Sequence, residues 1–465
     1  MPMPRPPEKF PPPFRWLKRI LLAYAILIPA LIATWFTWSW YAHRALQKQI
    51  DAAHARGEPI EPEDFDRLLP TVDPAKNAAL HYERAATLCV WTSAQDRWDR
   101  DRNYNDPPDY DMAASISDTC RAALDEAYLG ATFSQARWST LPSAEIYGTA
   151  WPSYGRLRRV VNTLKLAAEY HHHIHDDAAA LRDVATILHC ADSHRPAPAL
   201  MGSVVATAFE EVACSALMEI LPDISIGTDH KQADPQSARA LLARLLDDKE
   251  RIPSRLRSWY GERSFAIYFE DSGMSRTFGL TMESILKKTP LRPLAEARNA
   301  ALLTSIANSV AQPFYPDMHL IYDPAPPLPE PRSLGEDFAT TWDYGVNAFR
   351  RAVLLEQRSI ADRRLAATAI AIRLWRADHP GAPFTSLEDL VPAYLAEIPA
   401  DPLAPDHHTL RYQPAGEVPR LYSVGDDGVD DHGTLRDKNG GYSYGRFQAL
   451  DLNFCLEPWA RPTSP

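Results

Sequence analysis

The pattern of hydrophobic and polar residues begins with one uninterrupted apolar run near the N-terminus. Residues 20–41, ILLAYAILIPALIATWFTWSWY, contain no charged side chain, and about 20 such residues are enough to cross a bilayer as a helix. Trp35, Trp38 and Trp40 gather at the C-terminal end of the run, where aromatic rings settle at the headgroup level. The run therefore predicts a single transmembrane helix, and the membrane is the first partner that the sequence indicates.

The charges that flank this run predict its orientation. Five basic residues precede the run and two stand between it and Asp51: Arg5, Lys9, Arg15, Lys18 and Arg19, then Arg44 and Lys48. Because cytoplasmic flanks carry the excess of Lys and Arg, we expect a cytoplasmic proline-rich tail at 1–19 and an exported remainder. This placement is that of a single-pass protein of the cytoplasmic membrane with its C-terminal bulk periplasmic or extracytoplasmic. A cleaved signal peptide is the alternative, although its apolar region is normally shorter and ends at a small-x-small site.

Helical periodicity dominates the predicted exported domain, residues 42–322. A polar helix continues from residue 42 to Gly57, where a glycine is well suited to end it. A second helix is expected over 73–91. The stretch 93–111 is charged and lacks periodicity, so it predicts an exposed loop.

The clearest helical pattern lies in the middle of the chain. Three apolar stripes follow one another at 157–174, 178–190 and 201–220, and this spacing predicts an antiparallel helical hairpin followed by a third helix. Small residues on these faces permit close packing, so the segment is similar to a tetratricopeptide-type hairpin, although no repeat of about 34 residues marks an array. Further helices are expected at 234–252, 256–270 and 283–311.

A proline-rich stretch separates this domain from a C-terminal module. Residues 323–334 contain DPAPPLPEPR, a composition typical of an extended connector, and we place a domain boundary there. A long helix is expected from Gly335 to Asp378, where Pro380 ends it. Short apolar runs then alternate with prolines, which predicts a small α+β module over 335–465. The expected fold class is therefore mainly α, with the small module at its C-terminus.

Composition and charge narrow the function classes. The 465 residues are 45% hydrophobic and 23% charged, which is ordinary globular usage, and this length predicts more than one domain. The net charge of −11, with no basic stripe beyond the N-terminus, argues against a nucleic-acid partner. Five cysteines lack the paired spacing of a zinc site. Three states stay open for them: a bridge of Cys190 with Cys214, a bridge of Cys89 with Cys120, or buried free thiols.

Five short segments of the C-terminal module carry a resemblance to a known family. They are Trp375–Gly381, Leu387–Leu390, Asp401-Pro402, Leu410–Tyr412 and Leu421–Gly428. In this order they resemble the globular domain of the major pseudopilin of type II secretion. The whole chain is similar to large, functionally uncharacterised bacterial membrane-anchored proteins that carry such C-terminal segments. The resemblance implies a calcium site at the turn of the last segment, with Asp427 and Asp451 among its ligands.

The chain departs from that family around its apolar run. A short leader, a glycine before the cleavage point and a glutamate early in the mature helix are not found there, and residues 42–334 separate the run from the module. We therefore expect no assembly into a pilus-like fibre. The transmembrane helix is interpreted as a fixed tether for a large exported body.

The residues of the acidic turn also support calcium through their own chemistry. Four carboxylates lie within six residues: Asp426, Asp427, Asp430 and Asp431. Glycines at 425, 428 and 433 permit turns that bring oxygen atoms together, and calcium accepts oxygen ligands in flexible geometry. A solvated acidic turn is the alternative interpretation. If calcium binds, its expected role is to hold the last strands together.

Two other clusters contain residues with useful chemistry. His171 and His175 are spaced by one helical turn, as two ligands of a transition metal would be, but histidines at a helix end also complement its dipole. His407 and His408 are a weaker candidate pair. The segment Trp259–Arg263 fits either a packed helix end or the rim of a binding groove.

Complete catalytic motifs are missing from the sequence: it has no nucleophile elbow, zinc-protease helix, P-loop or dinucleotide fingerprint. The leading hypothesis is a membrane-anchored cell-envelope protein that binds or scaffolds another protein, a role that rests on fold-level analogy. An envelope hydrolase with its site in the helical domain is the first alternative, and it predicts a pocket with perturbed titratable groups. An accessory component of a type II secretion-like system is the second.

Overall fold

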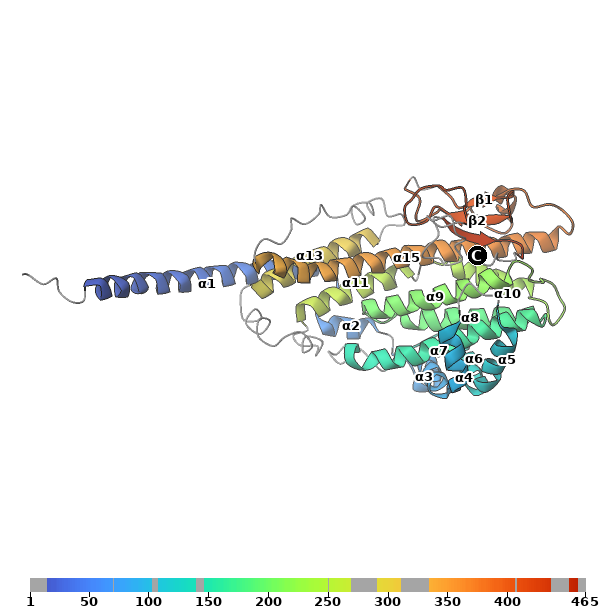
Figure 1. Ribbon diagram of the computed structural model, residues 1–465, viewed down its shortest axis with the longest axis horizontal. Coiled ribbons are helices and arrows are strands. Elements are labelled where there is room, and N and C mark those ends of the chain that lie inside the picture. Colours follow the sequence, from blue (N-terminus) through green and yellow to red (C-terminus); the bar gives the residue numbers. More distant parts are fainter. Residues whose placement is uncertain are drawn as a thin grey trace, which may run out of the picture.

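The structure is a computed structural model that describes residues 15–69, 71–102, 108–138, 146–249, 251–268, 291–310, 334–405, 408–435 and 451–458. Within these residues the protein is mainly helical, with one small antiparallel sheet near the C-terminus (Figure 1). The predicted fold class is confirmed at this level. The start of the predicted tail at 1–14, the proline-rich connector up to residue 333, and His407 lie outside the described residues.

The N-terminal helix α1, Arg15–Ala55, is a single element that contains the predicted apolar span. Its large hydrophobic side chains in that span are exposed, for example 63% for Leu22, and the helix is long and apolar enough to cross a membrane. The same helix then packs against α13, Leu291–Val310, and buries Ala53 there. In Figure 1 the apolar part of α1 projects from one end of the body.

Several short helices follow α1 in the chain. They are α2, Pro62–Leu68; the 3-10 helix Pro74–Lys76; α3, Ala78–Leu88; α4, Ser93–Asp101; α5, Tyr110–Thr119; and α6, Arg121–Gly130. The prediction of an exposed loop over 93–111 is wrong where α4 forms. Thr92 and Gln95 make a capping box there. The Gln95 backbone N–H donates to the Thr92 hydroxyl at 3.3 Å, and the Thr92 backbone N–H donates to the Gln95 side-chain oxygen at 2.8 Å. Because this reciprocal cap satisfies two helix-end donors, it favours a helix without an apolar stripe.

The helical hairpin predicted in the middle of the chain is present. α7, Ile146–His173, α8, Asp177–His194, and α9, Leu200–Ile220, pack pairwise against one another. Asp176 caps α8 by accepting the backbone N–H of Ala179 at 3.1 Å. α9 also has the length and hydropathy of a membrane span, but its apolar face is buried in this bundle, so we interpret it as a core helix.

The C-terminal segments predicted to be extended form a three-stranded antiparallel sheet in the order β1, β2, β3. The strands are β1, Arg411–Gln413; β2, Arg420–Ser423; and β3, Leu452–Cys455, and the 3-10 helix Leu387–Leu390 precedes them. Leu421 pairs with Tyr412 on one neighbouring strand and with Phe454 on the other. Leu421 and Phe454 are buried, which connects the sheet to the core beneath it.

The long predicted helix α15, Leu334–Asp378, joins this sheet to the helical bundle. It contacts β2 and β3, and it also contacts α9 and α10, Pro235–Leu246; Figure 1 shows it running along the body between the sheet and the bundle. One buried hydrophobic cluster extends from Ala78 in α3 to Phe454 in β3. The C-terminal segments thus share their core with the preceding helices.

The aromatic and charged segment that begins at Trp259 lies inside α11, Arg251–Tyr268. Trp259 and Arg263 are each 1% exposed. Gly261 lies so close to the carbonyl oxygen of Pro198, in the turn between α8 and α9, that a Cβ atom would overlap it. The segment is therefore packed, as the first of the two interpretations held, although it lies within a helix and not at its end.

Candidate functional site

Glu210 lies at the centre of a heavily charged part of the interior. It stands in the middle of α9 and is 3% exposed. Its carboxylate pairs with Arg195 at the C-cap of α8, with Arg251 at the start of α11 (3.2 Å), and more distantly with a third arginine. That third partner is Arg363 of α15 at 3.7 Å, and Ser359 of α15 donates its hydroxyl to the carboxylate at 3.0 Å. One carboxylate therefore joins four helices.

Further charged pairs surround Glu210. We define the arginine cluster as six arginines with four carboxylates: Arg195, Arg244, Arg251, Arg255, Arg363 and Arg364 with Asp192, Glu210, Asp248 and Glu356. Asp192 accepts a hydrogen bond from Arg244 at 2.6 Å. Asp248 accepts from Arg363 at 3.2 Å and from Arg364 at 3.3 Å. Because arginines outnumber carboxylates in this cluster, single carboxylates serve two or more guanidinium groups.

The arginines control the pKa values of the carboxylates that they contact. Burial alone would raise the pKa of Glu210, but three neighbouring arginines lower it to about 2. Burial is likewise outweighed at Asp192, whose pKa lies below its usual range beside Arg195 and Arg244. Both groups stay ionised at every physiological pH. They supply fixed negative charge rather than a base that takes up a proton near neutrality.

The sequence contains one indication of this site, a charged residue within an apolar helix, which a search for hydrophobic periodicity alone does not detect. The apolar stripe predicts α9 from residues such as Phe209 and Ala213, and Glu210 stands between them. A charged group in so apolar a helix needs a buried partner of opposite charge. The partners come from α8, α11 and α15, of which α11 and α15 lie far from α9 in the sequence, so the pattern of α9 does not identify them.

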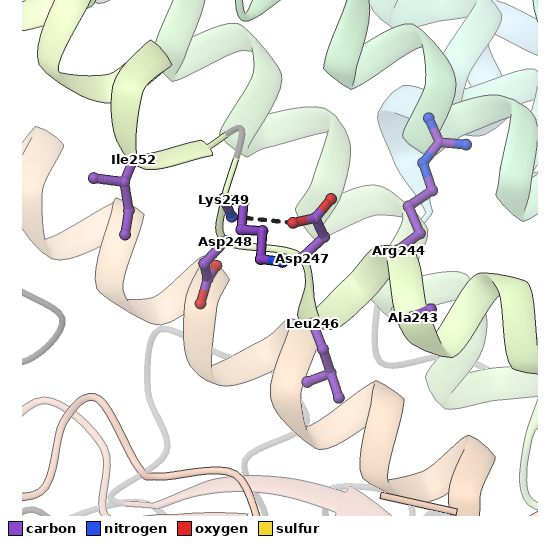
Figure 2. Close-up of a pocket in the computed structure, with 7 residues that line it drawn as sticks. All are labelled: Ala243, Arg244, Leu246, Asp247, Asp248, Lys249 and Ile252. Atoms are coloured by element: carbon purple, nitrogen blue, oxygen red, sulfur yellow. Dashed lines mark hydrogen bonds between the residues drawn. The ribbon is translucent and has the colours of Figure 1, made fainter. Parts of the chain in front are cut away.

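A hollow opens beside the arginine cluster at the turn between α10 and α11 (Figure 2). It has a volume of about 720 Å³ and is open to solvent. Its lining consists of Ala243, Arg244, Leu246, Asp247, Asp248, Lys249 and Ile252. Arg251 secures the turn, because its guanidinium donates to the carbonyl oxygens of Arg244 (2.8 Å) and Asp247. Asp248 belongs to both the hollow and the arginine cluster, so the buried charges help to shape the hollow.

The lining of the hollow mixes opposite charges with apolar side chains. Figure 2 shows Lys249 next to Asp247, whose carboxylate accepts the backbone N–H of Lys249 at 3.0 Å. Leu246 and Ile252 contribute apolar surface. An open surface of this kind is closer to the polar, solvent-accessible rim of a protein–protein contact than to the enclosed apolar pocket of a small-molecule site.

Of the five aspartates predicted to bind calcium, Asp426 and Asp427 make their hydrogen bonds apart from the other three. Asp426 accepts two hydrogen bonds from Arg358 of α15, one of them from Nε to Oδ1 at 2.5 Å. The Asp427 carboxylate accepts the backbone N–H of Val429 at 3.1 Å within its own turn. The geometry therefore assigns Asp426 to the contact between the turn and α15.

The other three aspartates lie around the next turn of the chain. Asp451 is fully buried and accepts the backbone N–H groups of Asp431 (3.4 Å) and Gly433 (2.8 Å), while Asp430 pairs with Arg411 at 3.2 Å. Burial, with the nearby charges of Asp431 and Asp430, raises the pKa of Asp451 to about 6. Among the described residues, no three carboxylate, imidazole or thiol groups are grouped to hold a metal ion. Calcium at this turn stays a prediction.

The histidine run at the end of α7 is held by carboxylates. His171 is 2.6 Å from the Asp183 carboxylate, which also accepts a hydrogen bond from the Tyr128 hydroxyl at 2.6 Å. α7 ends at His173, and His175 has a positive φ of 58°. His175 therefore does not continue the helix face of His171, and this geometry gives no support to a metal shared by the two.

His172 connects α7 to two other parts of the bundle. Its ring nitrogens contact Asp177 at the start of α8 (2.6 Å) and Asp223 after α9 (2.9 Å). Burial lowers the pKa of His172, but the two carboxylates outweigh burial and raise it above the ordinary value of about 6.5. The stabilisation from protonated His172 is thus fully present below about pH 6.5 and is lost as the pH rises through the raised pKa.

We expect the melting temperature of the full chain to fall between about pH 6 and about pH 9, and His172→Gln to flatten this slope because glutamine does not titrate. Tryptophan fluorescence during heating measures both profiles. His230→Gln is the matched control, since His230 also stands beside an aspartate but its side chain is 84% exposed. Equal slopes for the wild type and His172→Gln would contradict the prediction.

Comparison of the chain with protein-family models, with curated proteins and with solved structures gave no match. Its proposed function therefore rests on the geometry of its own described residues.

Proposed function

We propose that this protein is anchored in the bacterial inner membrane by α1 and binds another cell-envelope protein with its exported helical body. α1 is the observation that carries the proposal. Its apolar part exposes large hydrophobic side chains that a lipid environment would cover. Its C-terminal part is packed into the body. A peptidase that removed the apolar part as a signal peptide would have to cut α1 close to its packed part. Retention of the apolar part as an anchor therefore accounts better for one uninterrupted helix.

The proposed orientation follows from the charges that flank the apolar span. Lys18 and Arg19 stand at its N-terminal end, with further basic residues before them, so the N-terminus is placed in the cytoplasm and the body in the periplasm. Because a helix is stiff and α1 runs on into the body, the body is held in a defined position relative to the membrane. This refines the tether hypothesis: the attachment is a rigid one.

The proposed contact for the partner protein is the hollow between α10 and α11. In Figure 1 α10 lies near the end of the body opposite α1, and the turn that lines the hollow leads from α10 back to α11, apart from the projecting apolar part of α1. Arg251 and Asp248 hold its turn to the buried arginine cluster. A surface that is rigid before binding loses little conformational freedom when a partner docks.

The same geometry supports an envelope hydrolase less well. General acid–base catalysis needs a group whose pKa lies near the working pH, whereas the arginines hold the pKa of Glu210 at about 2. Burial raises the pKa of Glu356, but this carboxylate pairs with Arg255. The space that Glu356 lines with Glu211 is about 60 Å³, which holds a few water molecules rather than a substrate.

The binding proposal can be tested with a photo-crosslinking amino acid in place of Lys249, which is exposed at the hollow. The full chain is produced in the native host and irradiated, and adducts are separated by mass and identified. We expect one discrete adduct with another envelope protein. The same probe at Lys231, an exposed position outside the lining of the hollow, is the control. No adduct at Lys249, or the same adducts at both positions, would overturn the proposal.

Calcium at the acidic turn is a separate proposal, supported by the resemblance to pseudopilins and by the surroundings of Asp451. A cation there would offset the repulsion from Asp430 and Asp431 that contributes to the raised pKa of Asp451. The expected role is structural, at the junction of β2, β3 and the turn between them.

We expect a calcium chelator to lower the melting temperature of the full chain, and Asp427→Ala and Asp451→Asn each to abolish the difference, because a ligand that binds the folded state stabilises it. Thermal scans with chelator alone and with chelator plus excess calcium measure the effect. Asp118→Ala, at a position 71% exposed on α5, is the control and should leave the chelator effect unchanged. Identical wild-type curves with and without chelator would reject the site.

A further inference from the structure

Two buried cysteines from separate helices lie in contact. Cys89 is the C-cap of α3, and Cys120 stands at the junction of α5 and α6. Their sulfur atoms are 3.3 Å apart, with the Cys89 thiol donating to Cys120. The exposed fractions are 3% for Cys89 and 1% for Cys120. Because a disulfide bond is about 2 Å long, a small movement of the two side chains is enough to form one.

The surroundings of the pair hold the two sulfurs in place. Thr163 of α7 is fully buried, and its hydroxyl lies 3.4 Å from the Cys89 sulfur and accepts the indole N–H of Trp91 at 3.0 Å. The hydrogen bond from Cys89 lowers the pKa of Cys120, and the charge of Arg159 acts in the same direction. These contacts fix the positions of the two sulfurs in the folded protein.

We propose that Cys89 and Cys120 form a disulfide in the exported protein and so tie the end of α3 to the junction of α5 and α6. Both cysteines are capping residues, Cys89 at the C-cap of α3 and Cys120 at the junction of α5 and α6. The alternative pair, Cys190 and Cys214, lies on α8 and α9. The contact between the sulfur atoms of Cys89 and Cys120 is the observation that supports the first pair. An oxidising compartment beyond the membrane is what allows the bond to persist.

The reaction is a thiol–disulfide exchange with the disulfide of an envelope thiol oxidase. The thiolate of one cysteine of the pair attacks one sulfur of that disulfide, and the other sulfur of the oxidase leaves as a thiolate. The second cysteine loses its proton and attacks the sulfur of the first, which releases the bound oxidase sulfur as a second thiolate. The two cysteines have then lost two protons and two electrons, and the oxidase is left as a dithiol.

The burial of the pair determines when this exchange takes place. With exposed fractions of 3% and 1%, neither sulfur is open to an oxidase in the folded protein. The bond therefore forms during folding, before α7 covers the pair, and afterwards resists reduction. The disulfide has a structural role, because a catalytic redox pair must meet its substrate at the surface.

The test counts thiols in the full chain taken from membranes. Cells are quenched in acid, the protein is denatured, and free thiols are labelled with a maleimide that adds mass, with and without prior reduction. Of the five cysteines, Cys89 and Cys120 should be protected until reduction, and a peptide that links them should appear in the digest. Cys89→Ser should free Cys120 for labelling, and Cys120→Ser should free Cys89. Cys190→Ser is the matched control and should leave the linked peptide in place.

A second readout is the melting temperature of the purified full chain in detergent. A reductant present during heating reaches the sulfurs as the chain unfolds and should lower it by about 3 °C in the wild type, because the bond restricts the unfolded chain. Cys89→Ser should melt at the same temperature with and without reductant. This comparison is made within each variant, so a general loss of stability in the variant does not affect it.

Labelling of Cys89 and Cys120 without reduction, in protein taken from membranes, would overturn the proposal. Refolding of that same protein in the presence of copper phenanthroline, which lets the oxidant reach the thiols before they are buried, then identifies the cause. Formation of the linked peptide under the oxidant would show that the pairing is correct and the proposed export is wrong. No linked peptide under the oxidant would show that the pairing itself is wrong.

Discussion

Glu210→Ala should lower the melting temperature of the full chain by about 5 °C. The substitution removes the carboxylate shared by Arg251 and Arg363, which are 4% and 2% exposed. Taking away one partner of a buried ion pair costs about 4 kcal/mol, because the remaining charge stays buried without compensation. Divided by the unfolding entropy of a unit of about 400 residues, this cost corresponds to about 5 °C. Tryptophan fluorescence during heating measures the shift.

Asp118→Ala is the control for this experiment. Asp118 pairs with Arg121 on the surface, where the two side chains are 71% and 74% exposed, so its loss should shift the melting temperature by less than about 1 °C. The stabilisation from ionised Glu210 is present above about pH 4.5 and is lost as the pH falls through the folded pKa of about 2. The Glu210→Ala effect should therefore stay constant from about pH 6 to about pH 9. A shift no larger than that of Asp118→Ala would contradict the role of Glu210.

Gly261→Ala should lower the melting temperature of the full chain by about 4 °C. Gly261 is inside α11, and a Cβ atom there would overlap the carbonyl oxygen of Pro198. Because the obstacle is backbone, no rotamer change relieves it, and α11 must move away from the turn between α8 and α9. Forced overpacking of this kind costs about 3 kcal/mol, which corresponds to about 4 °C for a unit of about 400 residues. The same heating experiment measures it.

Gly155→Ala is the matched control, because it makes the same change within a helix. A Cβ atom at Gly155 of α7 meets no other atom within 4 Å. Alanine favours a helix over glycine by about 1 kcal/mol, so Gly155→Ala should leave the melting temperature unchanged or raise it slightly. The expected result is a difference in sign between the two variants. Equal shifts at Gly261 and Gly155 would show that contact with Pro198 is not the cause.

The local pattern predicted most helices well because their signals are carried by neighbouring residues. The apolar stripes of α8 and α9, the Asp234-Pro235 start of α10 and the proline stop after Asp378 are all short-range features. The same reasoning failed over Ser93–Asp101, where few residues are apolar and the N-terminal capping box is the clearer signal. Helices of that kind need a search for capping residues rather than for stripes.

The residues of the candidate site were much harder to predict from the sequence than the helices were. Glu210 is visible as a charge within an apolar stripe, but its partners on α8, α11 and α15 cannot be assigned by spacing. The aspartates of the acidic turn were identified as a group, yet the structure separates Asp426, which pairs with Arg358, from Asp451, which is buried among backbone donors. Long-range packing decides which charges meet.

By itself, the sequence determined the properties that depend on residues near one another along the chain. These are the apolar span within α1, the helical periodicity of the bundle, the long α15 and the extended C-terminal segments. Only the tertiary structure decided the rest: that α1 continues into the body, that Glu210 gathers arginines from three other helices, and that Cys89 meets Cys120. The physical reason is that a pattern of apolar positions specifies which face of each helix is buried, whereas the partner of a buried charge or thiol depends on how those faces pack together.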